Sequence, residues 1–214
     1  MTPNEIRNAK FGPIVAKNLN NRGFEACYVA TKEEALAQAL AWIPEGAVIA
    51  WGGSVTMQQI GMMDEVKSGK YNVIDRDKAA NPAEKVELMR QALLSDVYLT
   101  SSNAISQDGQ LVNVDGNGNR TAAINYGPKT VIVVAGMNKV VPTVEDAVTR
   151  ARTIAAPINM QKFANENTST VCAKTGMCGN CNSPDCICNE ILITRRCKPA
   201  GRIKVVLVGE ELGF

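Results

Sequence analysis

The sequence predicts an α/β protein with a mainly parallel sheet flanked by helices and an antiparallel meander in the middle of the chain. Two segments indicate the parallel part, Ala47–Trp51 and Thr130–Gly136, because each is a short continuous apolar run typical of a strand buried on both faces. Strand-like and helix-like segments alternate along the N-terminal half, which favours a parallel sheet with loops gathered at the carboxyl ends of its strands. The turn signals Asp108-Gly109 and 115–120 predict the meander.

Helix start signals separate the strands of the N-terminal half. Thr2 and Thr31 are each followed three residues later by glutamate, a capping box that opens a helix, and Asn81-Pro82 is a third start signal. The first helix is expected to run to about Asn20, and a further helix should end near Ile60. The predicted strands of this half are residues 24–30, 47–51, 71–74 and 96–100.

The second half is expected to open with the meander. Its three short strands are predicted at residues 101–105, 110–114 and 121–126, followed by the apolar strand 130–136. Thr143 should start a helix that reaches about Ala155, and the last strands are expected near 190–194 and 202–208.

Composition limits the class of protein. The chain has 214 residues, 45% of them hydrophobic and 21% charged, enough for one globular core. Neither a signal peptide nor an apolar run that could span a membrane is recognisable, so we expect a cytoplasmic protein with no membrane partner. A net charge of +2 without a basic stripe argues against nucleic acid as a partner. With no repeat or linker, residues 1–214 are predicted to form one domain.

The cysteines are concentrated near the C-terminus. Six of the seven lie between residues 172 and 197: Cys172, Cys178, Cys181, Cys186, Cys188 and Cys197. A thiolate is both a nucleophile and a soft metal ligand, so the cluster indicates a metal site, a set of disulfides or redox-active thiols. We expect residues 172–197 to be a metal-binding excursion within the single domain. Cys27, inside a predicted strand, is interpreted as a small buried residue.

The spacing of these cysteines favours an iron–sulfur cluster over zinc. The chain has no histidine and only one C-x2-C pair, Cys178 and Cys181, whereas a structural zinc site usually shows two such pairs. Iron–sulfur clusters are held by thiolates in tight, uneven runs, and Gly176, Gly179 and Pro184 would let the backbone fold round one. Zinc remains the alternative metal. A reducing cytoplasm argues against disulfides.

Several polar residues at predicted strand ends indicate a pocket for a small anion. The turn Gly52–Thr56 joins a buried strand to a helix and would direct backbone N–H groups toward a phosphate or carboxylate; the alternative is an ordinary capped turn. Arg120 offers a bidentate donor, and Lys139 follows the second apolar strand, although lysine in such a loop is often merely solvated. The candidate binding residues are Gly52, Gly53, Ser54, Thr56, Asn103, Asp115, Arg120 and Lys139. Asp108 and Asp115 are candidate general bases.

Taken together, these motifs resemble the lactate-utilisation (LUD) domain family in its short, cysteine-bearing form. The resemblance covers nearly the whole chain. It is carried by Gly52-Gly53-Ser54-x-Thr56, Asn103-Ala-Ile-x-x-Asp108-Gly109, Val112-Asn113-x-Asp115-Gly116-x-Gly118-Asn119-Arg120, Tyr126-Gly127-Pro128-Lys129, Gly136-x-Asn138-Lys139 and the cysteine run with Asn182-Ser183-Pro184 and Ile187-Cys188-Asn189.

The resemblance implies a fold like that of NagB, ribose-5-phosphate isomerase (RpiA), coenzyme A transferases and formyltetrahydrofolate cyclo-ligase. It also implies metal ligands at Cys172, Cys178, Cys181 and Cys188. Cys186 stands where the family pattern has a basic residue, so it is an alternative fourth ligand. Coenzyme A transferases use a catalytic glutamate, and none is placed in the corresponding region here, which counts against acyl-CoA transfer.

Two functions are therefore compared. The first is a LUD-domain protein with a [4Fe-4S] cluster and an anion pocket, in a redox or electron-transfer role in organic-acid metabolism, with lactate as one candidate. Its partners would be a small anionic metabolite and a redox protein, with homo-oligomerisation left open. The alternative is a non-redox enzyme or ligand-binding module for a phosphorylated or carboxylated small molecule, with a structural metal.

Overall fold

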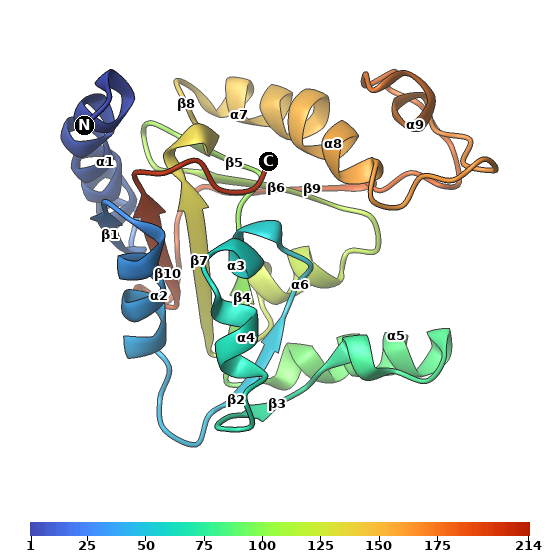
Figure 1. Cartoon of the computed structure of the whole chain (residues 1–214), viewed down its shortest axis with the longest axis horizontal. Coiled ribbons are helices and arrows are strands. Elements are labelled where there is room, and N and C mark those ends of the chain that lie inside the picture. Colours follow the sequence, from blue (N-terminus) through green and yellow to red (C-terminus); the bar gives the residue numbers. More distant parts are fainter.

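The computed structural model describes residues 1–214 and contains two sheets (Figure 1). The larger sheet has six parallel strands in the order β1-β10-β7-β4-β2-β3. Their bounds are β1 Glu25–Val29, β2 Val48–Trp51, β3 Asn72–Val73, β4 Val97–Thr100, β7 Thr130–Gly136 and β10 Ile203–Val208. The two apolar runs lie inside it as β2 and β7, so the predicted α/β class with a mainly parallel sheet is confirmed.

The smaller sheet has four strands in the order β8-β5-β6-β9. Its strands are β5 Ala104–Ser106, β6 Leu111–Asp115, β8 Val140–Val141 and β9 Glu190–Thr194. Antiparallel pairs join β5 to β6 and β6 to β9, whereas β5 and β8 are parallel. The tight turn at Gly109, with a φ of 89°, makes the predicted β5–β6 hairpin.

Helices cover both faces of the large sheet. The helices of the first half are α1 Pro3–Asn21, α2 Lys32–Ala41, α3 Val55–Gln59, α4 Met62–Val66 and α5 Pro82–Gln91, with short 3-10 turns η1 Arg76–Lys78 and η2 Ala92–Leu94. The capping boxes at Thr2 and Thr31 are present as predicted. One face packs against α2, α3 and α4, and the other against α1, α6 and the small sheet. No helix is both long and apolar enough to cross a membrane.

The predicted third strand of the meander, residues 121–126, is wrong. This segment is helix α6, Asn119–Asn125, and the third antiparallel strand is β9 from the far end of the chain. The side chain of Asp115 accepts hydrogen bonds from the backbone N–H groups of Arg120 and Thr121, which satisfies two free donors in the first turn of α6, and from that of Asn117 in the loop before it. The glycine- and asparagine-rich loop is therefore a strand-to-helix connection.

The helix after Thr143 covers the outer face of the small sheet. It runs through α7 Val144–Arg150, the π-helical turn η4 Ala151–Ala155 and α8 Ala156–Met160, five residues beyond the expected end. Ala147, Ala151 and Ala156 pack on Val112 and the strands beside it. Beyond α8, the short helix α9 Val171–Thr175 and the cysteine loop extend outward from the end of the small sheet (Figure 1).

Candidate functional site

A cavity of about 420 Å³ opens at the carboxyl ends of the central parallel strands. Residues that follow β2, β3, β4 and β7 all reach it, as expected where a parallel sheet gathers its loops. Its charged lining consists of Arg76, Arg120, Lys139 and Lys162 against one acid, Asp115. The excess of positive charge suits a small anion.

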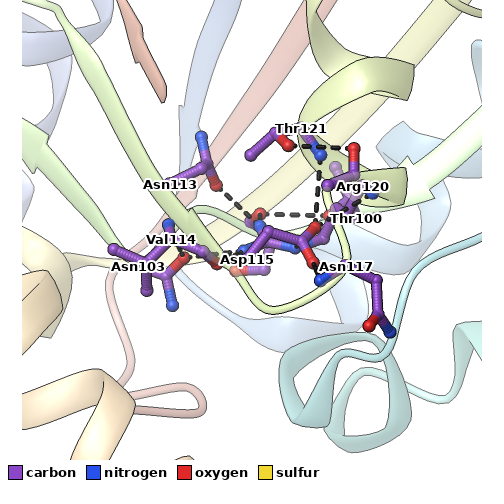
Figure 2. A network of polar contacts seen from close by, with 10 residues as sticks. Thr100, Asn103, Asn113, Val114, Asp115, Asn117, Arg120 and Thr121 are labelled. Atoms are coloured by element: carbon purple, nitrogen blue, oxygen red, sulfur yellow. Dashed lines mark hydrogen bonds and ion pairs between the residues drawn. The ribbon is translucent and has the colours of Figure 1, made fainter. Parts of the chain in front are cut away.

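Arg120 organises one wall of this cavity (Figure 2). Its guanidinium donates to the side-chain oxygens of Asn113, at 2.7 Å, and Asn103, at 2.8 Å. It also donates to the backbone carbonyls of Ser101, at 3.2 Å, and Val114. These four acceptors lie on β6 and on the segment after β4, so Arg120 ties the two sheets together. Its donors are largely used within the chain, and Nε lies 3.8 Å from Asp115.

Lys139 is a second buried cation, and it has no carboxylate partner. It belongs to the 3-10 turn η3 Met137–Lys139, directly after β7, and the residue is 3% exposed. Nζ donates to the hydroxyl oxygens of Thr56 and Ser101, both at 2.9 Å. Burial, with smaller contributions from Arg150 and Arg120, lowers the pKa of Lys139 from 10.5 to about 7.

Arg76 is one of the cations of this cavity that remain available to a ligand. It lies in η1, just after β3, and lines the cavity. Its buried Nε has no hydrogen-bond partner, and its ion-pair contact with Asp77 is 4.0 Å long. A Cβ at Gly53 would lie 3.2 Å from the Arg76 guanidinium, so the glycine leaves room for that group. No nitrogen of the Arg76 side chain donates a hydrogen bond within the chain, so this guanidinium can offer its terminal amino groups to an anion in the cavity.

The Gly52–Thr56 turn contributes less directly than expected. The Ser54 hydroxyl accepts from the backbone N–H of Met57 and caps α3, as in an ordinary capped turn. Gly52 does not line the cavity; a Cβ there would lie 2.9 Å from the Arg120 side chain. Gly53, Ser54 and Thr56 do line it.

The two candidate general bases lie in different places. Asp115 lines the cavity, but its carboxylate caps α6 through the backbone N–H groups of Arg120 and Thr121 and also accepts from that of Asn117. Asp108 lies outside the cavity, on the β5–β6 turn, where it accepts from Arg22, Ser106 and Gln110. These contacts outweigh partial burial and lower the pKa of Asp108, so its carboxylate is a structural ion-pair partner.

Five thiols line a second cavity of about 220 Å³. They are Cys172, Cys178, Cys181, Cys186 and Cys188. Gly176 ends α9 with a φ of 75°, and Asn180 also has a positive φ of 48°, so the loop turns sharply around the cavity. A Cβ at Gly179 would lie 2.6 Å from the Val171 side chain, so the glycine lets the loop pack closely against α9. Cys27, in β1, and Cys197, buried beside β10, lie outside this cavity.

The donor set fits a thiolate-bound cofactor. Burial, together with the neighbouring Cys186, Cys178 and Cys181, raises the pKa of Cys188 to about 12, so several thiolates here would repel one another unless a cation balanced them. Backbone hydrogen bonds at Val171 and Ser183 lower the pKa of Cys181. No three cysteine, aspartate or glutamate side chains are close enough to hold a single metal ion. A cluster is larger than one ion and spaces its thiolates more widely.

The two cavities share a wall made by Ala156 and Ile187. Asn189 donates at 3.0 Å to the carbonyl oxygens of Gly116 and Cys186, joining the cysteine loop to the loop before α6. A Cβ at Gly116 would lie 3.1 Å from the Cα of Ile187, a tight contact, so the glycine eases the close approach of the two loops. A ligand in either cavity would therefore touch the same partition.

The family model described as LUD domain matches residues 13–208, nearly the whole chain. The chain belongs to the LUD domain family. Among solved structures, it is similar to a DUF162 family protein from Deinococcus radiodurans, with a TM-score of 0.51 and 14% sequence identity over 94% of this chain and 98% of that one. At this identity the likeness shows the fold. A comparison with functionally curated proteins finds no match.

Membership of the LUD domain family implies a role in the utilisation of lactate or another organic acid. Of the predicted pocket residues, the LUD domain brings seven to one cavity: Gly53, Ser54, Thr56, Asn103, Asp115, Arg120 and Lys139. Sequence reasoning missed Arg76 and Lys162. Arg76 follows the predicted strand 71–74, so its position at a strand end was a usable signal, whereas Lys162 had none.

Proposed function

We propose that this LUD domain carries a [4Fe-4S] cluster in its cysteine cavity and binds a small organic anion beside it, in an electron-transfer role in organic-acid metabolism. Lactate is the first anion to test. The observation that carries the proposal is the shared wall: five thiols and a cation-lined pocket lie on opposite sides of Ala156 and Ile187. A redox partner protein would exchange electrons with the cluster.

The proposed ligands are Cys172, Cys178, Cys181 and Cys188. Cys186 competes for the fourth position, because its sulfur lies 3.2 Å from that of Cys188. When bound, the cluster would supply one-electron redox chemistry. The chain's own residues have separate tasks: Arg76 would bind the carboxylate, Arg120 holds the pocket wall, and Met160 and Pro157 give the cysteine cavity an apolar side.

Metal and sulfide analysis of protein purified without oxygen tests this proposal. A broad visible absorption band with roughly four irons and four acid-labile sulfides per chain is expected. Cys181→Ala should lose most of the iron, whereas the matched control Cys27→Ala, outside the cavity, should keep it. One zinc per chain, or full iron content in Cys181→Ala, would overturn the cluster assignment. Comparing Cys186→Ala with Cys188→Ala identifies the fourth ligand.

A non-redox enzyme or ligand-binding module is the second candidate, and Lys139 favours it. A buried amine with no carboxylate partner is suited to acid–base or nucleophilic chemistry, with the cysteines serving as a structural clip. Colourless, zinc-bound protein that turns over a phosphorylated or carboxylated compound would support the enzyme. Ligand-induced stabilisation without turnover would support the binding module.

A further inference from the structure

The Lys139 nitrogen contacts two hydroxyl groups and no carboxylate. A neutral amine has two hydrogens, and here both have acceptors, the hydroxyl oxygens of Thr56 and Ser101 at 2.9 Å. No group of the chain donates a hydrogen bond to Nζ. Lys139 also lines the cavity, so a ligand there can approach this nitrogen.

Charge around Lys139 favours this neutral form. The side chain is buried, it forms no ion pair, and Arg150 and Arg120 are the charged groups that act on it. Both are cations, so they oppose a third positive charge. The pKa of Lys139 is lowered to about 7, which makes a large fraction of the amine neutral near neutral pH.

The same cavity can hold an anionic group next to this amine. Arg76 lines the cavity and its side chain donates no hydrogen bond within the chain, and Lys162 is an exposed residue of the same lining. A ligand that carries a carboxylate would pair with the cations that line this cavity, and a carbonyl carbon on the same ligand would be presented to the amine. Gly213 has no side chain, and a Cβ there would lie 3.1 Å from Nζ, so the glycine keeps space beside the nitrogen.

We propose that Lys139 is a nucleophile that forms an imine with the carbonyl carbon of a small 2-oxo acid held by its carboxylate in this cavity. The inference rests on the anion pocket of the proposed function and is independent of the metal in the cysteine cavity. It names both the substrate class, a 2-oxo acid, and the residue that reacts with it.

The reaction balances without an oxidant or reductant. The lone pair of Nζ attacks the carbonyl carbon, and the carbonyl oxygen takes up a proton to give a carbinolamine. Loss of water then breaks the carbon–oxygen bond and leaves a carbon–nitrogen double bond. The hydroxyls of Thr56 and Ser101 lie within hydrogen-bond distance of the nitrogen and are placed to accept and return its protons.

Trapping with cyanoborohydride tests the inference. Added hydride reduces an imine to a stable secondary amine, so full-length protein incubated with pyruvate and cyanoborohydride should gain the mass of one reduced pyruvate unit. Peptide mapping should place it on Lys139. Lys139→Met should lose the adduct, whereas Lys85→Met, which removes an exposed lysine from α5, should retain it.

Calorimetry with pyruvate in the absence of reductant separates this inference from the proposed function. Pyruvate that binds but gives no adduct would overturn the imine and leave the anion pocket standing. Pyruvate that neither binds nor reacts would overturn both. An adduct spread over surface lysines, or one that persists in Lys139→Met, would also overturn the assignment.

Discussion

Arg120 and Lys139 are both buried cations in one cavity, but their surroundings give them different roles. Arg120 is surrounded by acceptors from β6 and from the segment after β4, so its guanidinium is a structural element. Lys139 has two hydroxyl acceptors and no negative charge nearby. The sequence predicted both as anion donors because a single sequence shows residue type and strand end but not how many acceptors surround a side chain.

Arg76 should contribute more to anion affinity than its neighbours. We expect Arg76→Met to weaken binding of a small carboxylate such as lactate by roughly 10- to 100-fold, because a hydrogen bond to a charged group contributes about 1.5–3 kcal/mol. Lys78→Met, which removes the same charge from an exposed position in η1, is the control and should bind nearly as well. Calorimetric titration measures the anion affinity of both variants. Equal losses of affinity would mean that only the net charge of the protein matters.

Lys139 should make stability depend on pH. Its pKa is lowered from 10.5 to about 7 in the folded state, so the unfolded state binds more protons between these values and the free energy of unfolding rises with pH there. Replacement by methionine removes the penalty. The free energy of unfolding of Lys139→Met should therefore exceed that of the wild type most at pH 6. This difference should shrink by roughly 2–3 kcal/mol by pH 9. Denaturant titrations at both pH values measure it; a constant gap would contradict a buried, unpaired amine.

At the scale of elements, helix α6 shows where sequence reasoning failed. Residues 121–126 were predicted as a strand because the preceding Asn-Gly turn resembled hairpin chemistry. The adjacent alanines at 122 and 123 are good helix formers, and Asp115 supplies acceptors for the first turn. The aspartate lies at the end of β6, too far from the predicted turn centre to be recognised as a cap from the sequence alone.

This capping role can be measured. Asp115→Ala should lower the free energy of unfolding by about 1–2 kcal/mol, the usual cost of losing a side-chain cap, because three backbone N–H groups lose their acceptor. Asn117→Ala is the matched control, since its side chain makes no hydrogen bond and only its backbone N–H is engaged. A comparable loss in Asn117→Ala would mean that the loop, and not the cap, determines stability.

At the scale of the molecule, local sequence patterns were sufficient to predict the parallel sheet but not the smaller four-stranded sheet. The runs that became β2 and β7 are apolar enough to be recognised without a partner. The pairing of β6 with β9 joins residues 111–115 to 190–194, and no local pattern encodes a contact between segments so distant in sequence. The shared wall between the cavities arises from this pairing, so it could not be predicted. The cluster and its ligand set stay predictions.

Ile187 lines both cavities, so the binding free energies of the two occupants can be coupled through it. If an anion on one side shifts Ile187, the affinity for whatever the thiols hold changes by some factor, and by thermodynamic necessity the thiol-bound group changes the affinity for the anion by the same factor. The protein would then behave as two linked binding sites. The concentration of organic acid would change how tightly the cofactor is retained, and loss of the cofactor would change the affinity for the acid.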